Sequence, residues 1–417
     1  MEGANSVTAR SASRPDWMRR FSMNMGRDIS LLTWAMFVWS LGAGFYASFW
    51  SLFIEETGAT SAQMGLIIGL QGIMRIAVML PSGIAADRFS RRFMIWAGTA
   101  ATVPSVLIYF IADDWWQLIP GVLIGAFAAC SVPAISSYVA EAAPSQSRAR
   151  AFTMVYTVGP STALIIGPLI GGFLSERTSL QFLFLPTAIF YALGTFMFWK
   201  ISERPNKPKK ATEQATYRDA IQNRSVLVAS LLQGILLFVL TTGITFIPNY
   251  LRDVQGQNLA TIGRLSSAAA IGSITIVMMV GRVKWVSPSR GIAIATACIG
   301  FVCFGVLFID NAHLLIFLFV LRGGFSVAWT LFAAVLGDTV PWHLRGRSFA
   351  MAEFIGGIGF AIAPFVAGPL YGLDPKFPLI FCAAGAPILV VLILLFERRV
   401  VRPAMALNLA VSPEGTA

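Results

Sequence analysis

Residues 81–92 read Pro-Ser-Gly-Ile-Ala-Ala-Asp-Arg-Phe-Ser-Arg-Arg and lie between two long apolar runs. A polar stretch this short predicts a tight turn between two membrane helices. Gly83 has no Cβ, so two helices can approach closely there. Asp87 can lie near the positive N-terminal end of another helix or pair with an arginine. Three arginines, a residue type that favours the cytoplasmic side of a membrane, complete the turn: Arg88, Arg91 and Arg92.

The composition predicts an integral membrane protein. Of the 417 residues, 56% are hydrophobic and only 12% are charged, whereas soluble domains are about one-quarter charged. The net charge of +11 does not point to a nucleic-acid partner, because most of the 31 Lys and Arg residues lie on alternate segments between apolar runs. Basic residues accumulate in cytoplasmic loops, so this asymmetry predicts that both termini are cytoplasmic.

Twelve apolar runs are long enough to cross a bilayer. Lipid requires each of them to be a helix, because a helix satisfies its own backbone hydrogen bonds. The runs cover residues 29–54, 61–86, 93–112, 116–140, 151–174, 180–200, 225–250, 261–281, 291–309, 314–337, 349–371 and 378–396. A polar stretch, 202–224, separates six-helix bundles at 29–201 and 225–397, with cytoplasmic tails expected at 1–28 and 398–417. The predicted fold is an all-α membrane protein.

The two halves share a repeated motif. The pattern Glu141-x2-Pro144-x3-Arg148-x-Arg150-x-Phe152-x-Met154 recurs as Asp338-x2-Pro341-x3-Arg345-x-Arg347-x-Phe349-x-Met351. A similar offset carries Gly65 onto Gly263 and Gly83 onto Gly281. This register predicts two pseudo-symmetric halves related by a parallel internal repeat.

The glycine, acid and arginines of residues 81–92 closely resemble the signature loop between helices 2 and 3 of the major facilitator superfamily. Ser90 stands where that pattern usually has glycine. The resemblance implies twelve helices around a central cavity, transport by alternating access, and a cytoplasmic gate in which Asp87 lies near the start of helix 11. The charge pattern offers Glu141 as a partner for Arg91 or Arg92. The gating candidates are Gly83, Asp87, Arg88, Arg91, Arg92, Glu141, Asp338 and Arg345.

The fifth helix carries Gly167-Pro168-x2-Gly171-Gly172. This stretch resembles the fifth-helix motif of the superfamily's exporters, although Ala163 stands where a preceding glycine is usual. Paired glycines allow close contact between helices and proline bends the helix axis. The motif therefore favours export, and a kinked packing helix without that meaning is the alternative.

Three ionisable residues inside the predicted helices mark the candidate transport site, because charge within a membrane is costly and usually functional. Arg75 shares a face of helix 2 with Gln71, and Arg322 lies in helix 10 in line with Ser326 and Trp329. Guanidinium groups recognise anions or strong hydrogen-bond acceptors. The alternative is that each arginine bonds only to neighbouring helices. Glu353, in the first turns of helix 11, is either a proton carrier or an interfacial carboxylate.

Aromatic and hydroxyl stripes supply further candidates. Trp39 and Tyr46 share a face of helix 1, Thr241 and Thr245 share one of helix 7, and Ser137 lies on helix 4. The resemblance implies that helices 1, 4, 7 and 10 line the cavity, which favours these residues as substrate contacts. Aromatic residues also pack cores and gather at the membrane interface, which is the alternative for these positions.

The predicted function is proton-coupled export of a small neutral or anionic organic molecule across a bacterial plasma membrane. The alternative is an uptake symporter or facilitator for an organic anion. A cationic substrate is disfavoured, since no acidic residue lies deep in a helix. A membrane enzyme is less consistent with the sequence, which has no HExxH motif and no nucleophile-elbow motif. A non-transporting receptor is also disfavoured, because we find no appended soluble domain in the sequence. The four cysteines lack metal-ligand spacing, so we expect no metal, cofactor or disulfide, and we expect a monomer.

Overall fold

The structure is a computed structural model that describes residues 26–203, 222–282, 287–340 and 344–403. Within these ranges, twelve helices or interrupted helices are long and apolar enough to cross a membrane. This confirms the twelve predicted spans. Every regular element described is helical, which confirms the all-α fold.

The first six spans form one bundle. Their helices are α2 (Arg27–Tyr46), α3 (Trp50–Glu56), α4 (Ser61–Arg88), α5 (Arg91–Ala100), α6 (Thr102–Ile111), α7 (Leu118–Gly125), α8 (Ser131–Ala142), α9 (Arg148–Thr153), α10 (Gly159–Arg177) and α11 (Phe184–Trp199). The second bundle contains α13 (Arg224–Ile244), α14 (Ile247–Asp253), α15 (Leu259–Arg282), α16 (Pro288–Val306), α17 (Ala312–Arg322), α18 (Gly324–Thr339), α19 (Arg345–Leu373) and α20 (Phe377–Phe396).

Side-chain caps begin equivalent helices in the two bundles. The hydroxyl of Ser90 accepts a hydrogen bond from the backbone N–H of Phe93 at 3.2 Å and starts α5. Ser287 caps α16 in the same way, accepting from the N–H of Arg290 at 3.3 Å. A serine satisfies a backbone donor that a glycine would leave to water. The serine in place of the superfamily's glycine therefore has a structural reason.

Spans 1, 4, 7 and 10 are each interrupted within their length. Span 1 has a 3₁₀ turn at Ala47–Phe49, and span 4 has one at Ala126–Cys130. Span 7 breaks between α13 and α14, and span 10 breaks at Gly323 between α17 and α18. The break at Gly323 lets this span touch α15, because a Cβ there would overlap the backbone nitrogen of Ser273. Interrupted helices of this kind often mark transport sites, since they free backbone groups.

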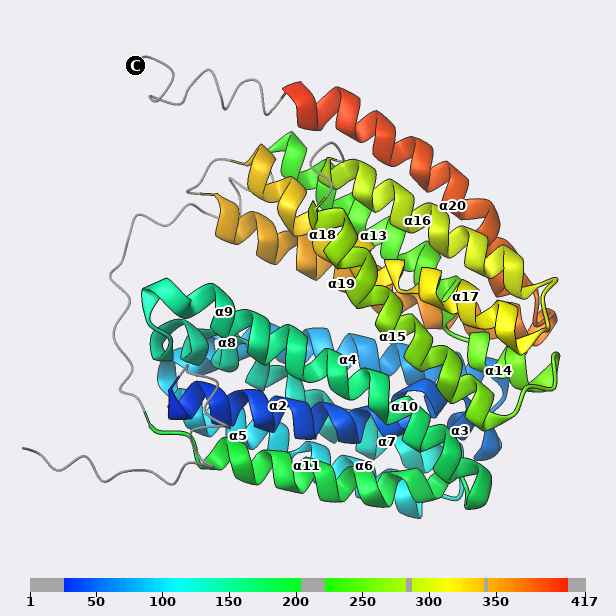
Figure 1. Cartoon of the computed structure of the whole chain (residues 1–417), viewed down its shortest axis with the longest axis horizontal. Coiled ribbons are helices and arrows are strands. Elements are labelled where there is room, and N and C mark those ends of the chain that lie inside the picture. Colours follow the sequence, from blue (N-terminus) through cyan, green and yellow to red (C-terminus); the bar gives the residue numbers. More distant parts are fainter. Residues whose placement is uncertain (1–25, 204–221, 283–286, 341–343, 404–417) are drawn as a thin grey trace, which may run out of the picture.

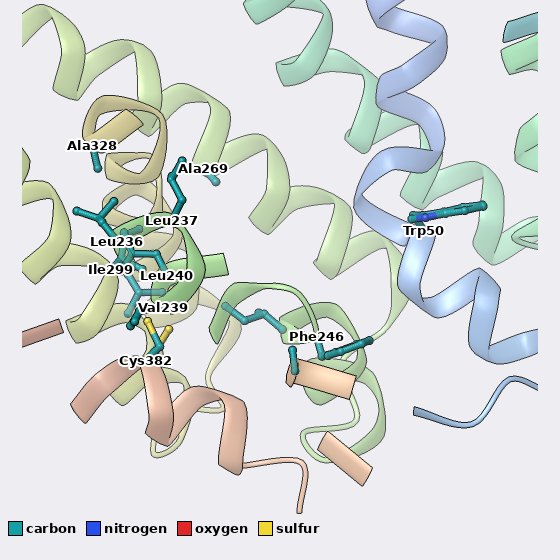
Figure 2. Close-up of a cluster of buried hydrophobic side chains, with 14 of the residues drawn as sticks. Trp50, Leu236, Leu237, Val239, Leu240, Phe246, Ala269, Ile299, Ala328 and Cys382 are labelled. Carbon is teal, nitrogen blue, oxygen red and sulfur yellow. The ribbon is translucent and has the colours of Figure 1, made fainter. Parts of the chain in front are cut away.

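The second bundle is organised around α13. In Figure 2, Leu236, Leu237 and Leu240 of this helix are gathered with Ile299 of α16 and Cys382 of α20 in one buried cluster. Apolar residues surround α13 on most sides, and most of its residues are buried. The polar residues near the end of α13, described below, thus extend from a helix that packs in the core of the second bundle.

The two bundles touch through a pseudo-symmetric pair of contacts. α4 packs on α19, and α10 packs on α15. A Cβ on Gly65 would overlap the carbonyl oxygen of Pro364, and a Cβ on Gly263 would overlap that of Pro168. The predicted repeat equates Gly65 with Gly263, so the same close approach is built twice. Figure 1 shows the bundles meeting on the side where α3 and α14 lie and diverging toward α9 and α18.

Polar contacts also join the bundles at the α3–α14 end. The guanidinium of Arg252 on α14 pairs with Glu55 at 2.8 Å and with Glu56 at 3.3 Å, both on α3. The side-chain amide of Asn249 donates to the Glu55 carboxylate. Glu176 at the end of α10 accepts from the backbone N–H of Ala260 at 3.0 Å. We call this set of contacts the closed end.

Candidate functional site

A cavity of about 340 Å³ lies within the first bundle. Four of the predicted site residues line it: Trp39 and Tyr46 from α2, and Gln71 and Arg75 from α4. The other walls come mainly from α6, α8, the 3₁₀ turn at Ala126–Cys130 and α11. No Asp or Glu is among the described residues that line it.

Aromatic rings form one end of this cavity. The ring of Tyr191 on α11 stacks on Trp39, with centroids 5.0 Å apart and planes within 14°. The Tyr191 hydroxyl lies 3.4 Å from that of Tyr46, and the Trp39 indole N–H donates to the Thr102 hydroxyl at 3.3 Å. These bonds fix the ring orientations, so the aromatic surface is preorganised for an apolar ligand group.

Sequence reasoning missed the contribution of the third span. Thr99, Thr102, Ser105 and Tyr109 all line the cavity. They recur every three or four residues, which places them on one helical face. This stripe of polar residues on one face could have predicted that the third span lines the cavity. Tyr191 stands alone in an apolar run and gave no such signal.

Arg75 is exposed to the cavity and forms no hydrogen bond or ion pair with any residue in the described ranges. An arginine within a membrane span must be paired or hydrated. The cavity supplies the space for water or a ligand, so this guanidinium keeps its donors available.

A second pocket, of about 280 Å³, lies between the bundles next to the closed end. Trp50 and Ile68 line it from the first bundle, and Thr241, Thr245 and Arg322 line it from the second. The Arg322 guanidinium carbon lies 5.5 Å from the centre of the Phe319 ring. Arg75 and Arg322 therefore line different pockets in this conformation, and their predicted contact with substrate stays a prediction.

The remaining candidates of span 10 point elsewhere. The Trp329 indole N–H donates to the Glu353 carboxylate, at 3.1 and 3.3 Å from its two oxygens. The Ser326 hydroxyl lies 3.4 Å from the hydroxyl of Ser273. None of these residues lines either pocket. The predicted alignment of Ser326 and Trp329 with Arg322 assumed a continuous helix, and the break at Gly323 interrupts it.

Ser137 is not among the described residues that line the first cavity. Ala128, Ser131 and Ile135 line it from this span instead. The 3₁₀ turn before α8 has about three residues per turn instead of 3.6, so it rotates the faces that follow. The predicted face assumed a regular α-helix.

Of the gating candidates, Arg91, Arg92 and Glu141 have described side chains. Arg91 is buried and pairs with Glu141, which joins α5 to α8 within the first bundle. The Arg92 Nε donates to the Trp199 carbonyl at 3.0 Å. The charge pattern therefore predicted Glu141 correctly as the partner of Arg91.

The other gating candidates stay predictions. The side-chain surroundings of Gly83, Asp87, Arg88, Asp338 and Arg345 lie outside what the structure describes. The predicted proximity of Asp87 to the start of α19 belongs to the same set.

The sequence analysis did not predict the closed end as a functional site. Arg252 also contacts Asp253 at 3.0 Å, and Asp253 accepts from the Tyr371 hydroxyl at 3.2 Å. Glu55 and Arg252 occupy equivalent positions of the repeat, since one offset relates both this pair and Glu141 with Asp338. Positions that a two-fold repeat relates come into contact only near its axis, and Glu55 and Arg252 do so with opposite charges. That was the signal in the sequence.

Within the described ranges, no group of three His, Cys, Asp or Glu side chains is arranged to hold a metal ion. The described residues that concern the predicted site therefore form two pockets and one network of charges between the bundles.

The family model of the Major Facilitator Superfamily matches residues 32–313. The chain belongs to the Major Facilitator Superfamily. An MFS-type transporter of Methanocaldococcus jannaschii is 23% identical over 363 residues, covering 82% of this chain and 92% of that protein. The quinolone resistance protein NorA of Staphylococcus aureus is 20% identical over 396 residues, covering 90% and 97%.

A crystal structure of the nucleoside transporter NupG matches with a TM-score of 0.73 and 14% identity, covering 89% of this chain and all of that one. At this identity the similarity concerns the fold alone. Superfamily membership makes the chain a multi-pass membrane protein and a secondary transporter of small molecules, not an enzyme.

Proposed function

We propose that this superfamily member exports a small neutral or anionic, partly apolar organic molecule from the bacterial cytoplasm in exchange for protons. The observation that carries the proposal is Arg75, a guanidinium in an aromatic-lined cavity with no acidic residue on its described walls. We expect the protein to act as a monomer in the plasma membrane with both termini in the cytoplasm.

The cavity's chemistry selects the substrate class. A cation placed beside Arg75 would be repelled and would find no carboxylate among the described lining residues. An oxyanion or a carbonyl oxygen would accept hydrogen bonds from the guanidinium fork. The stacked rings of Trp39 and Tyr191 favour an apolar, planar portion of the same molecule.

Two observations support export. The Gly167–Gly172 stretch, which resembles the exporter motif, forms the contact of α10 with α15, where a Cβ on Gly172 would crowd Ala260 and Gly263. The relative named for quinolone resistance aligns over nearly the whole chain, and a resistance protein is consistent with outward transport.

The predicted topology places the α3–α14 end outside. On that assignment, the conformation described is sealed outside by the closed end, and the divergence of the bundles faces the cytoplasm.

The second candidate is uptake or facilitated diffusion of an organic anion. A further arginine, Arg322, lines the pocket between the bundles, and its Nε has no partner among the described residues, which favours this candidate. The candidates differ in their coupling to protons: an exporter exchanges substrate for protons, an uptake symporter moves both in the same direction, and a facilitator is not coupled.

Transport into proteoliposomes under imposed pH gradients separates the candidates. An antiporter accumulates substrate when the lumen is the more acidic side, because outward proton flow drives substrate inward. A proton symporter accumulates substrate when the bath is the more acidic side. A facilitator shows counterflow but no accumulation under either gradient. The substrate is first found by counterflow against a panel of neutral, anionic and cationic aromatic solutes, with protein-free liposomes as the control.

A further inference from the structure

A groove of about 810 Å³ lies between α13 and α20 on the surface of the second bundle. Among the described residues, it shares no lining residue with the two pockets of the candidate site. Figure 1 shows α20 along the edge of the second bundle that lies away from the first bundle. The groove is therefore distinct from the candidate transport site.

One wall of the groove is a single face of α13. Its lining residues recur every three or four positions: Arg224, Val228, Leu231 and Ile235. At about 1.5 Å per residue, this wall extends for about 16 Å along the helix. That length is about half the thickness of the hydrocarbon core of a bilayer, which is about 30 Å. The groove thus matches the depth of one leaflet.

The facing wall comes from the end of α20. Leu392, Leu395 and Arg399 line it, and Arg399 belongs to the π-helical turn Glu397–Val401 that ends this helix. Arg224 is the first residue of α13. Since α13 begins where α20 ends, both arginines lie at the same end of the groove. Apart from Ser225, the other lining residues are apolar.

The apolar part of the groove is open to its surroundings. Leu231 is 48% exposed and Ile235 is 51% exposed, and Leu392 and Leu395 are each 41% exposed. Exposed apolar side chains within a membrane span contact lipid chains. A chain that lies between two walls touches both helices, so it gains more dispersion contacts than it would on the convex surface of one helix.

The two arginines lack a counter-ion. Neither Arg224 nor Arg399 forms a hydrogen bond or ion pair with a residue in the described ranges. No described Asp or Glu lines the groove. The acid of the same turn, Glu397, is buried and engaged by the Ser287 hydroxyl and by Arg402. The groove therefore presents two guanidinium groups to a ligand.

We propose that this groove binds a phospholipid with an anionic headgroup, whose phosphate lies between Arg224 and Arg399 and whose acyl chain lies along the apolar walls. A phosphodiester accepts charge-assisted hydrogen bonds from guanidinium groups. A zwitterionic headgroup would bring an ammonium group that finds no carboxylate among the described lining residues. Basic pockets between membrane helices on the cytoplasmic side bind anionic headgroups, and the predicted topology places the start of α13 on that side.

The inference concerns a lipid and not the transported molecule, so it does not depend on the proposed substrate or direction of transport. It is tested by native mass spectrometry of the purified full-length protein in a neutral detergent. The protein is titrated with phosphatidylglycerol or with phosphatidylcholine that carries the same acyl chains. We expect the first phosphatidylglycerol to bind more tightly than the first phosphatidylcholine.

Substitutions of the arginines test the headgroup site. Arg224→Gln and Arg399→Gln should each weaken phosphatidylglycerol binding about fivefold, the effect expected of one basic residue near a membrane surface. Both should leave phosphatidylcholine binding unchanged. Arg398→Gln is the matched control, because Arg398 is exposed on the same turn but does not line the groove. It should keep the wild-type affinity for phosphatidylglycerol.

A bulky substitution tests the acyl-chain site while both arginines remain. Leu392→Trp should fill the groove and weaken phosphatidylglycerol binding. Leu394→Trp is its control, because Leu394 is exposed on the same helix at 38% but does not line the groove. Without lipid, all these variants should unfold at the wild-type midpoint, since the altered side chains are exposed. Phosphatidylglycerol should raise the midpoint less in the three groove variants than in the controls.

Inorganic phosphate distinguishes a lipid site from a site for the anion alone. It lacks the chains that the apolar walls contact, so a thousandfold excess should not displace phosphatidylglycerol. Displacement by phosphate together with equal binding by Leu392→Trp and Leu394→Trp would overturn the lipid assignment. Equal losses in Arg398→Gln and Arg399→Gln would show attraction by the general surface charge and would also overturn it. A wild type that binds the two lipids equally would do the same.

Discussion

An arginine inside a membrane is stable only when it is paired or hydrated, and Arg75 lacks any partner in the described ranges. Its side chain is exposed to a cavity that Trp39 and Tyr46 also line. A side chain in this position is available to bind substrate and contributes little to packing. The unpaired guanidinium is therefore the residue on which the substrate class depends.

Arg75→Lys keeps the charge but loses the planar fork of donors, so it should weaken substrate binding by about 1–3 kcal/mol. The measurement is the substrate concentration for half-maximal counterflow in proteoliposomes. Arg264→Lys is the control, because Arg264 bonds to Thr261 outside both pockets and should leave this concentration unchanged. Equal behaviour of the two variants would contradict a substrate role for Arg75.

Glu353 is an exposed carboxylate on α19 that accepts from the Trp329 indole. If Glu353 carries the coupled proton, Glu353→Gln should preserve counterflow but abolish accumulation driven by an acidic lumen. Trp329→Phe keeps the carboxylate and removes its donor, so it should retain accumulation. Full gradient-driven accumulation by Glu353→Gln would place the proton carrier elsewhere.

At the level of elements, the sequence predicted the positions of the twelve spans well. It did not predict the breaks within them or the helical faces that follow those breaks. The twelve runs of apolar residues follow from bilayer thickness, which depends only on composition and length. The break at Gly323 depends on the backbone of Ser273 in another helix, and no local pattern encodes such a contact. The missed face of Ser137 has the same cause, since a 3₁₀ turn precedes α8.

The contact of α10 with α15 provides a test at this scale. Gly263→Ala adds a methyl group that would overlap the carbonyl oxygen of Pro168, and a backbone atom cannot move aside cheaply. We expect loss of transport and an unfolding midpoint several degrees lower. Gly372→Ala is the control, since its nearest atom, the Cβ of Ser61, would lie at an ordinary 3.5 Å. Equal transport and stability in the two variants would show that this close approach is dispensable.

Across the whole molecule, the repeat was the most informative feature of the sequence. It related Gly65 to Gly263, and the structure places both glycines at equivalent contacts between the bundles. It also related Glu55 to Arg252, although charge at the outer helix ends was interpreted only as topology. The stacking of Tyr191 on Trp39 could not be predicted, because it depends on how α11 lies against α2.

The closed end should control the balance between the two conformations of the transporter. Arg252 lies among three carboxylates, two of them on the opposite bundle. Arg252→Gln would leave these acids without their cation, so they would repel one another as the bundles approach. We expect the population to shift toward separation of this end by about 1–3 kcal/mol.

Distances between spin labels at Thr178 and Val254, which are exposed on opposite bundles, measure this shift and should lengthen in Arg252→Gln. Arg264→Gln removes the same charge on the same side, but its partner Thr261 lies in its own bundle, so the distances should stay as in the wild type. Asp87→Asn should act in the opposite sense, because the predicted contact of Asp87 with the start of α19 holds the bundles together at the other end. If Arg252→Gln and Asp87→Asn moved the distances in the same direction, the two ends would not work as alternating gates.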